Sequence, residues 1–278
     1  MGKITAAEVN NLRKQTGAGI MDCKKALMES EGDLEKAIDY LRKKGQKLAN
    51  KRADKEANEG YVIAKTNSDK NFAIVIVTNC ETDFVAINKD FIDFCNNIAD
   101  KALESKPKSL EELKSLNING RTISDNLTDL IGKIGEKLEI AHYEYIDAPI
   151  VFGYNHQGNR LATIMGLNKV EVENIENIGH EVTMQIAAMN PVAIDKDDVD
   201  PKIIEKEIEI GKEQARLEGK PENLIEKIAL GKLNKFYKES TLLNQMFVRD
   251  NKITIRQYLN ENDKELTVTK FARLQLAN

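Results

Sequence analysis

The segment FAIVIVTNCETDFVA, residues 72–86, joins an uninterrupted apolar run to a polar corner (residues 79–86). The run Phe72–Val77 contains only apolar residues, which predicts a buried strand. Thr82 or Asp83 can cap a helix that begins directly after the strand. The segment therefore predicts a strand that leads to one large aromatic side chain, Phe84, at the start of a helix.

The spacing of the residues that follow leaves two interpretations of Phe84. Apolar residues recur at three- and four-residue steps after it, which is the spacing of a buried stripe on one helix. In the first interpretation Phe84 begins this stripe and lies in the core; in the second it is exposed to a partner. Spacing alone favours the core. The stripe would contain Phe84, Ile87, Phe91, Phe94 and Ile98.

Composition indicates a soluble protein with room for more than one compact unit. The chain has 278 residues, of which 41% are hydrophobic and 31% charged. Its net charge of −4 provides no general attraction for nucleic acid. The first residues do not resemble a signal peptide, and no apolar run reaches the roughly 18 residues that a bilayer span needs. We expect a cytoplasmic protein without membrane contact.

The sequence shows no pattern typical of an enzyme, metal or nucleotide site. Cys23, Cys80 and Cys95 form no C-x-x-C motif, which together with the missing signal peptide favours free thiols. The histidines lack metal-ligand spacing, and no G-x-S-x-G motif is present. Gly17–Gly19 is too short for a phosphate-binding loop. We therefore expect no cofactor, no metal, no direct nucleotide site and no catalytic chemistry.

Residues 1–55 predict a small helical module and a basic linker. Thr5 and Glu8 form a capping box that starts a helix at Ala6. This helix is expected to end near Thr16, where Gly17–Gly19 supplies a permissive backbone for a tight corner. A second helix is expected over 21–30, and Asp33 can cap a third that ends at Gly45. Three short helices of this kind predict a ubiquitin-associated-like (UBA-like) bundle, a type generally used for docking.

The third helix and the linker carry a concentration of positive charge. Residues 36–55 contain eight Lys or Arg residues against Asp39 and Asp54. One interpretation is an arm that contacts RNA or the ribosome. The other is a solvated helix face that continues into a mobile linker, and the absence of interleaved aromatic residues favours it.

Two similar α+β subdomains are predicted after the module. The first spans 56–147 and the second spans 148–197 together with 237–278. In each, a strand hairpin precedes a helix, and the repeated order suggests two related units. Expected strands are 61–64, 72–77, 140–145, 150–154, 161–167 and 266–276, with a short segment at 246–248; expected helices are 110–116, 123–135 and 179–189.

An antiparallel helical hairpin is predicted as an insertion in the second subdomain, at residues 198–236. Gly219 ends its first helix, and Pro221 suits the first turn of its second. The apolar seam of this coiled coil either closes within the hairpin or pairs two copies into a homodimer. Its expected members are Ile204, Ile208, Gly211 and Ala215 on one helix and Leu224, Ile228 and Gly231 on the other.

Several of these stretches resemble the bacterial elongation factor Ts (EF-Ts) family. Thr5–Arg13 and Thr16–Leu27 resemble its N-terminal module, and Thr82–Val85 resembles its second signature. Gly219–Pro221 and Lys232–Phe236 fit its helical insertion. Order and spacing agree along nearly the whole chain.

The resemblance implies a guanine-nucleotide exchange factor for elongation factor Tu. In the family the N-terminal module docks on the GTPase domain; the matching positions here are Arg13, Ile20, Met21 and Lys24. It implies no catalytic chemistry of its own and no specific nucleic-acid partner.

The second signature implies the group that disturbs the magnesium site of the GTPase. Phe84 would insert near that site, with Asp83 making polar contacts beside it and Thr82 and Val85 framing both. A histidine in the second subdomain makes a further contact in the family, and His156 matches it approximately because the loop differs in length.

The chain departs from the family pattern at three places. Ile20 stands where many relatives carry Met, a change that conserves volume. Glu81 replaces a commonly neutral Gln, so we expect an altered charge beside Phe84. The additional C-terminal helix of some relatives does not follow the last strand, so its contacts are not carried over.

Overall fold

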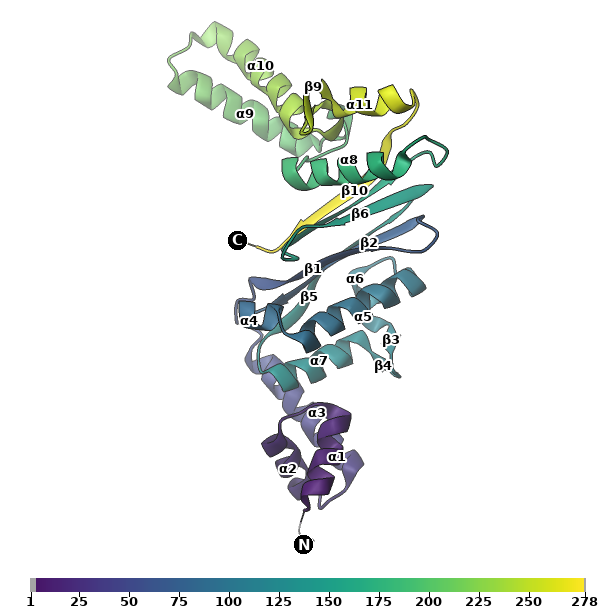
Figure 1. Ribbon diagram of the computed structural model, residues 1–278. Coiled ribbons are helices and arrows are strands. Elements are labelled where there is room, and N and C mark those ends of the chain that lie inside the picture. The colour runs from purple at the N-terminus through teal and green to yellow at the C-terminus, as the bar shows by residue number, and fades with distance from the viewer. Residues whose placement is uncertain (1–3, 278) are drawn as a thin grey trace.

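Two three-stranded antiparallel sheets pack face to face at the centre of the molecule (Figure 1). The structure is a computed structural model that describes residues 4–277, and its architecture is α+β as expected. The first sheet has the order β1-β2-β5 and the second the order β10-β7-β6. Their strands are β1 (Glu59–Thr66), β2 (Phe72–Cys80), β5 (Leu138–Asp147), β6 (Ile150–Asn155), β7 (Leu161–Leu167) and β10 (Val268–Gln275).

The alternation of side-chain direction along β2 explains why its sequence is continuously apolar. Ile74 and Ile76 lie in the cluster formed with the helices on the outer face of the sheet. Val75 and Val77 lie in the cluster between the two sheets. A strand that is buried on both faces needs no polar side, so the predicted buried strand is confirmed.

Helices cover the outer face of each sheet. The helices α5, α6 and α7 pack on the first sheet, and α8 packs on the second (Figure 1). The short helix α11 and the strand pair β8–β9 complete the layer on the second sheet. Of these, only the segment 246–248 was expected from the sequence. The bounds are α5 (Lys89–Ser105), α6 (Leu110–Ser115), β3 (Asn117–Ile118), β4 (Arg121–Thr122), α7 (Ile123–Ile134), α8 (Ile175–Met189), β8 (Met246–Phe247), β9 (Asp250–Thr254) and α11 (Ile255–Asn262).

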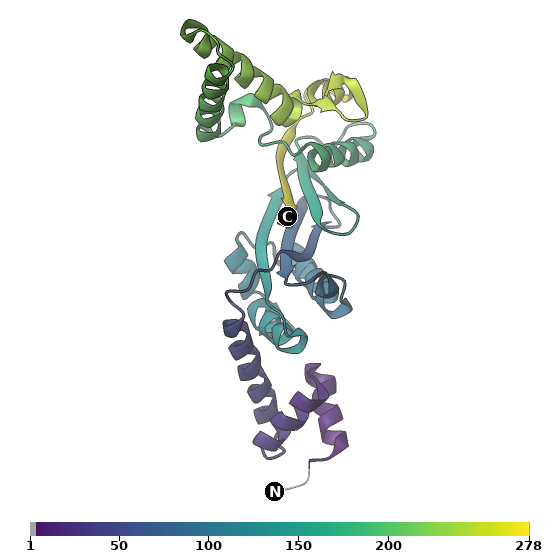
Figure 2. The same cartoon turned by 90° about the vertical axis from the view of Figure 1, so that its left-hand side faces the viewer.

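The N-terminal helices form a separate small bundle at one end of the molecule (Figure 2). They are α1 (Ala6–Thr16), α2 (Ile20–Glu29) and α3 (Leu34–Lys51). The predicted capping box is confirmed, because Thr5 Oγ accepts from the Glu8 N–H and Glu8 accepts from the Thr5 N–H. Leu12 and Leu27 are buried in the core of the bundle.

The expectation that α3 ends at Gly45 is wrong, since the helix continues to Lys51. Gly45 lies where α3 crosses α7. A Cβ at Gly45 would lie 2.9 Å from the carbonyl oxygen of Thr128, and one at Gly132 would lie 3.1 Å from Gly45 Cα. Both positions therefore need glycine because the two helix backbones are in direct contact.

Residues 36–51 are helix, so the expected solvated helix face extends further than predicted and leaves only residues 52–55 for the linker. Lys36 pairs with Asp33, the N-cap of α3, and Arg42 pairs with Asp39 one turn away on the helix. Lys44 pairs with Asp22 of α2, and Arg52 pairs with Glu81. Much of the positive charge is therefore neutralised within the chain, which weakens the RNA-arm interpretation.

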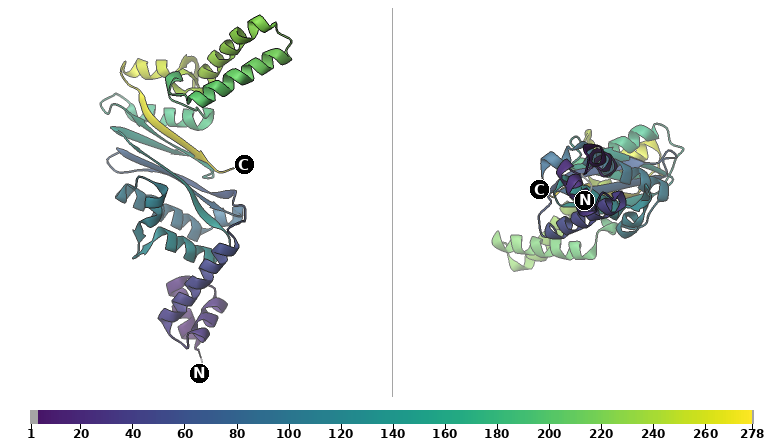
Figure 3. Two further views of the ribbon diagram at one scale, coloured as in Figure 1. Left: turned by 180° about the vertical axis from the view of Figure 1, so that it is seen from behind. Right: turned by 90° about the horizontal axis from the view of Figure 1, so that it is seen from below.

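The predicted helical hairpin is present as α9 (Pro201–Leu217) and α10 (Glu222–Ser240), and it projects from the end opposite the N-terminal bundle (Figure 3). Gly211 lies against Ala229, with its hypothetical Cβ 3.2 Å from Ala229 Cα. The expected seam of α10 is wrong at Leu224 and Gly231, which are exposed. The buried side chains of α10 are Ile225, Ala229 and Leu233.

We expect the substitutions Gly45→Ala and Gly231→Ala to change stability in opposite directions. Alanine favours a helix over glycine by about 1 kcal/mol in both cases. Gly231 has open space around its hypothetical Cβ, so this gain should be realised. At Gly45 the added methyl meets a backbone oxygen, and we expect a net loss of about 1–2 kcal/mol. Equal stabilisation of both variants in urea unfolding would contradict the α3–α7 contact.

Candidate partner-binding site

The corner after β2 forms a single helical turn, α4 (Asp83–Ala86), that is fixed from two sides. Thr82 Oγ caps the turn by accepting from the Val85 N–H at 3.4 Å and donates to Glu136 Oε1 at 2.8 Å. The Thr82 N–H donates to the other oxygen of Glu136 at 3.1 Å. Val85 is buried against Cys80 and Leu138, so the turn is anchored to the sheet.

The helix expected to run from the corner to Ile98 is interrupted. The turn α4 ends at Ala86, and Asn88 adopts an extended conformation with φ −69° and ψ 131°. The Asn88 side chain accepts from the Asp90 N–H at 2.9 Å and thereby caps a new helix, α5. This break changes the direction of the chain between Ile87 and Phe91.

The interpretation of Phe84 as a core residue is wrong. Phe91 and Ile98 are buried on α5, whereas Phe84 is 78% exposed and Ile87 is 76% exposed. Phe84 and Ile87 lie three residues apart and present adjacent apolar side chains to solvent beside a corner whose backbone is anchored. Exposed apolar groups of this kind on a fixed element are typical of a contact surface.

Asp83 and Cys80 complete the polar framework of the corner. The exposed carboxylate of Asp83 accepts from the Phe84 N–H at 2.9 Å. The buried thiol of Cys80 donates to the carbonyl oxygen of Thr82 at 3.1 Å. Burial, followed by the nearby carboxylate of Glu136, raises the pKa of the Cys80 thiol to about 12. Cys80 is therefore a neutral structural donor rather than a reactive thiolate.

The sequence predicts an altered charge beside Phe84 because of Glu81, but this carboxylate is paired with Arg52. Arg52 Nη1 donates to both carboxylate oxygens of Glu81, at 2.8 and 2.7 Å. The Lys137 N–H donates to Glu81 Oε1 at 2.5 Å. Although partial burial works against it, these hydrogen bonds hold the pKa of Glu81 below its ordinary value. Sequence reasoning missed this pairing because its partners are far apart in the chain.

The four docking positions expected from the resemblance are all exposed on the N-terminal bundle. Arg13 lies on α1, and Ile20, Met21 and Lys24 lie on α2. Ile20 is 51% exposed and Met21 is 74% exposed. Met28, which is 58% exposed, continues the same side of α2 but was not expected. The α2 face (Ile20, Met21, Lys24 and Met28) is therefore an apolar surface with one positive charge.

His156 is exposed in the turn between β6 and β7. Its Nδ1 lies 2.9 Å from the Tyr154 hydroxyl. The turn is fastened to β1, since Asn155 accepts from the Ala64 N–H at 2.7 Å and donates to the Ala64 carbonyl at 2.9 Å.

Two further contacts place this turn at the end of the first sheet that carries the corner. Arg160, which follows the turn, forms an ion pair with Glu59. Glu59 pairs with Cys80 in the register of β1 and β2. The turn that holds His156 and the corner that holds Phe84 therefore lie at the same end of the sheet.

Comparison with known proteins adds to this geometry. A family model described as "Elongation factor TS" matches residues 81–278. A protein named elongation factor Ts from Cytophaga hutchinsonii is 51% identical over 278 residues, covering 100% of both chains. Its counterpart from Christiangramia forsetii is 50% identical over 276 residues, covering 99% of this chain and 100% of the relative. One from Chloroherpeton thalassium is 40% identical over 275 residues, covering 97% and 95%.

The chain belongs to the elongation factor Ts family. This membership confirms the resemblance first drawn from Thr16–Leu27 and Thr82–Val85. The match to the EF-Ts model begins at Glu81, so it includes the whole of α4 and the exposed Phe84. It also includes the turn with His156, the second sheet and the helical hairpin.

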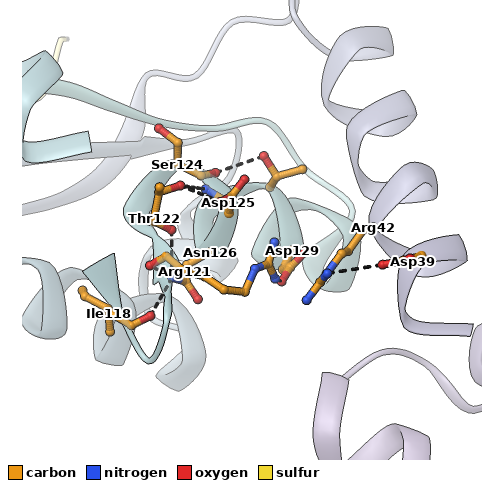
Figure 4. A network of polar contacts seen from close by, with 10 residues as sticks. Asp39, Arg42, Ile118, Arg121, Thr122, Ser124, Asp125, Asn126 and Asp129 are labelled. Carbon is orange, nitrogen blue, oxygen red and sulfur yellow. Dashed lines mark hydrogen bonds and ion pairs between the residues drawn. The ribbon is translucent and has the colours of Figure 1, made fainter. Parts of the chain in front are cut away.

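A cavity of about 520 Å³ in this EF-Ts chain lies between the N-terminal bundle and the core. Its charged lining is largely paired: Lys133 lies 2.7 Å from Asp90, and Arg121 pairs with Asp129. Figure 4 shows α3 beside α7, with Asn126 bonded to the strands that precede α7. The cavity is a polar seam between helices and provides no convergent free groups for catalysis.

Two kinds of feature are absent from residues 4–277 of the EF-Ts chain. Within this range, no group of histidine, cysteine and acidic residues has the arrangement of a metal site. In the same range, no helix combines the length and apolar character that crossing a membrane requires.

Proposed function

We propose that this EF-Ts family member is a guanine-nucleotide exchange factor that binds elongation factor Tu in its GDP form and promotes release of GDP. The observation that supports this most directly is the 78% exposure of Phe84 on an anchored turn. Because the turn is already anchored, this large apolar side chain can insert into a partner without a rearrangement of the turn.

We assign the expected roles to residues of the two surfaces. Phe84 inserts near the magnesium site of the GTPase, and Asp83 makes polar contacts beside it. Thr82 and Val85 hold the turn, as their hydrogen bonds and burial indicate. Docking contacts come from Arg13, Ile20, Met21 and Lys24, with His156 as a further contact.

The mechanism follows from the role of magnesium in nucleotide sites. Magnesium bridges the phosphates and neutralises their charge, so disturbing its ligands weakens nucleotide binding. An inserted aromatic ring can shift packed elements because protein interiors transmit strain. Coupling between the two ligands is reciprocal, so rebinding of a nucleotide releases the factor.

Phe84 alone does not supply enough free energy for this task. Burial of one phenylalanine contributes roughly 1.5–3 kcal/mol. Acceleration of GDP release by about a thousandfold requires about 4 kcal/mol. The docking contacts of the α2 face must therefore contribute to the same complex.

The remaining parts of the chain receive roles consistent with this assignment. We propose that residues 1–55 act as a UBA-like docking module and that the α9–α10 hairpin is a coiled-coil arm that can pair two copies. The factor needs no catalytic chemistry, nucleotide site or specific nucleic acid of its own. We place its activity in the cytoplasm, together with a translational GTPase.

We expect substoichiometric amounts of the protein to accelerate release of labelled GDP from elongation factor Tu. Stopped-flow fluorescence of a labelled nucleotide, chased with excess unlabelled GDP, measures this rate directly. The expected acceleration is at least about a hundredfold, because the two surfaces together exceed the contribution of Phe84 alone. Binding without any change in the GDP release rate would overturn the proposal.

A further inference from the structure

The C-terminal end of α3 is joined directly to the corner that carries Phe84. The guanidinium of Arg52, which follows the last residue of α3, donates to both carboxylate oxygens of Glu81 at 2.8 and 2.7 Å. Glu81 immediately precedes Thr82, the cap of α4. The Arg52–Glu81 pair therefore connects the N-terminal bundle to the corner through side chains far apart in sequence.

Lys137 strengthens this connection from the start of β5. Its N–H donates to Glu81, and its Nζ donates to the carbonyl oxygens of Ala53 and Lys55 at 2.9 and 3.0 Å. The side chains of Glu81 and Arg52 are 16% and 32% exposed, so solvent screens their interaction less than that of a surface pair. The end of α3, the corner and β5 are fixed to one another at this point.

Further contacts connect α3 and α7 to the helix that carries the α2 face. Gly45 and Gly132 bring the backbones of α3 and α7 into contact. Lys44 of α3 pairs with Asp22 of α2. Lys133 of α7 lies against Gly17, just before α2, with its Nζ 3.0 Å from the position of a Cβ there. The orientation of α2 is thus set by contacts that end at the corner.

We propose that Arg52 and Glu81 are positioning residues that hold the α2 face at a fixed orientation to Phe84, so that both surfaces meet the partner as one rigid body. This inference rests on the proposed function and deepens it. When two contact surfaces belong to one rigid body, binding through the first already orients the second, so the second contact forms with little further loss of conformational entropy. A bundle that swings about the end of α3 would lose this advantage.

The first test reverses the charge of Arg52 in the Arg52–Glu81 pair. We expect Arg52→Glu to raise the concentration of factor needed for half-maximal GDP release by about fivefold, with the maximal rate kept within about twofold, because docking rather than insertion is weakened. Adding Glu81→Lys restores an opposite pair and should recover most of this loss. Lys47→Glu makes the same charge change on an exposed site of α3 and serves as the matched control.

The second test measures orientation in the free protein. Cysteines introduced at the exposed Glu29 of α2 and Glu111 of α6 carry spin labels, while the native cysteines are buried. We expect a narrow distance distribution in the parent protein and in the Lys47→Glu variant. We expect a broad distribution in Arg52→Glu and a narrow one again after adding Glu81→Lys. Since no GTPase is present, this result is independent of the exchange assay.

The outcomes separate this inference from the proposed function. An unchanged distribution in Arg52→Glu overturns the positioning role, and so does a broad distribution with an unchanged half-maximal concentration. Failure of the parent protein to release GDP overturns the exchange function alone. If Arg52→Glu does not fold, Glu81→Gln removes the charge at nearly constant volume, and it must broaden the distribution for the inference to stand.

Discussion

Replacement of Phe84 with alanine is expected to reduce the maximal rate of GDP release from elongation factor Tu by about 10- to 100-fold. The estimate follows from the roughly 1.5–3 kcal/mol that burial of a phenylalanine contributes, at 1.36 kcal/mol for each factor of ten. The loss should fall on the maximal rate, because the ring is accommodated only when the GTPase adopts its nucleotide-releasing state. Stopped-flow release measured over a range of factor concentrations separates this rate from affinity.

Loss of fold does not explain such an effect, because Phe84 is 78% exposed. We expect the free energy of unfolding of Phe84→Ala to stay within about 0.5 kcal/mol of the parent value. Leu217→Ala is the matched control, since Leu217 is 88% exposed at the tip of the helical hairpin. A rate that is equally reduced in both variants, or unchanged in Phe84→Ala, would contradict insertion of this ring.

The corner shows how far local sequence could predict the site. Of the two caps that the sequence predicts, Thr82 and Asp83, it is Thr82 that caps the turn, through a local hydrogen bond to the Val85 N–H. The break at Asn88 was missed because apolar spacing stays in phase across it, from Ile87 to Phe91. An asparagine that caps a new helix competes with continuation of the old one, and periodicity carries no signal of that competition.

A glycine at the end of an apolar helical pattern in this chain can either end the helix or allow close contact with another helix. Gly219 was correctly expected to end a helix, and its φ of +70° needs the left-handed region. Gly45 looked similar but lies inside α3, where it permits contact with Gly132 of α7. The difference depends on a helix almost ninety positions away in sequence, so no local pattern reveals it.

Non-local contacts explain the remaining errors. The strands of both sheets were largely predicted, whereas the face-to-face packing of the sheets depends on long-range pairing. The seam of α10 lies on Ile225 and Ala229 because Ala229 meets Gly211 of α9, and this register is set only when the two helices meet. The Arg52–Glu81 pair is of the same kind, since each residue alone has the pattern of an ordinary surface charge.

Replacement of Met21 with aspartate is expected to weaken binding to elongation factor Tu by about 100-fold. The variant loses burial of a methionine side chain and places an unpaired carboxylate against an apolar partner, which together cost about 3 kcal/mol. Met21 is 74% exposed and lies in the first turn of α2, where an acidic side chain favours the helix dipole. The bundle should therefore stay folded, and titration calorimetry measures the change in affinity.

Insertion and docking should respond differently to this substitution. At saturating concentration Met21→Asp should lower the maximal rate of GDP release much less than Phe84→Ala does, because Phe84 still reaches its site and the remaining docking contacts still form. Leu230→Asp, which changes an exposed leucine of α10, is the control and should leave affinity unchanged. Unchanged affinity in Met21→Asp would remove the α2 face from the interface. A maximal rate that falls as far as in Phe84→Ala would instead contradict the division of roles between α2 and α4, in which Phe84 supplies the larger share of the acceleration.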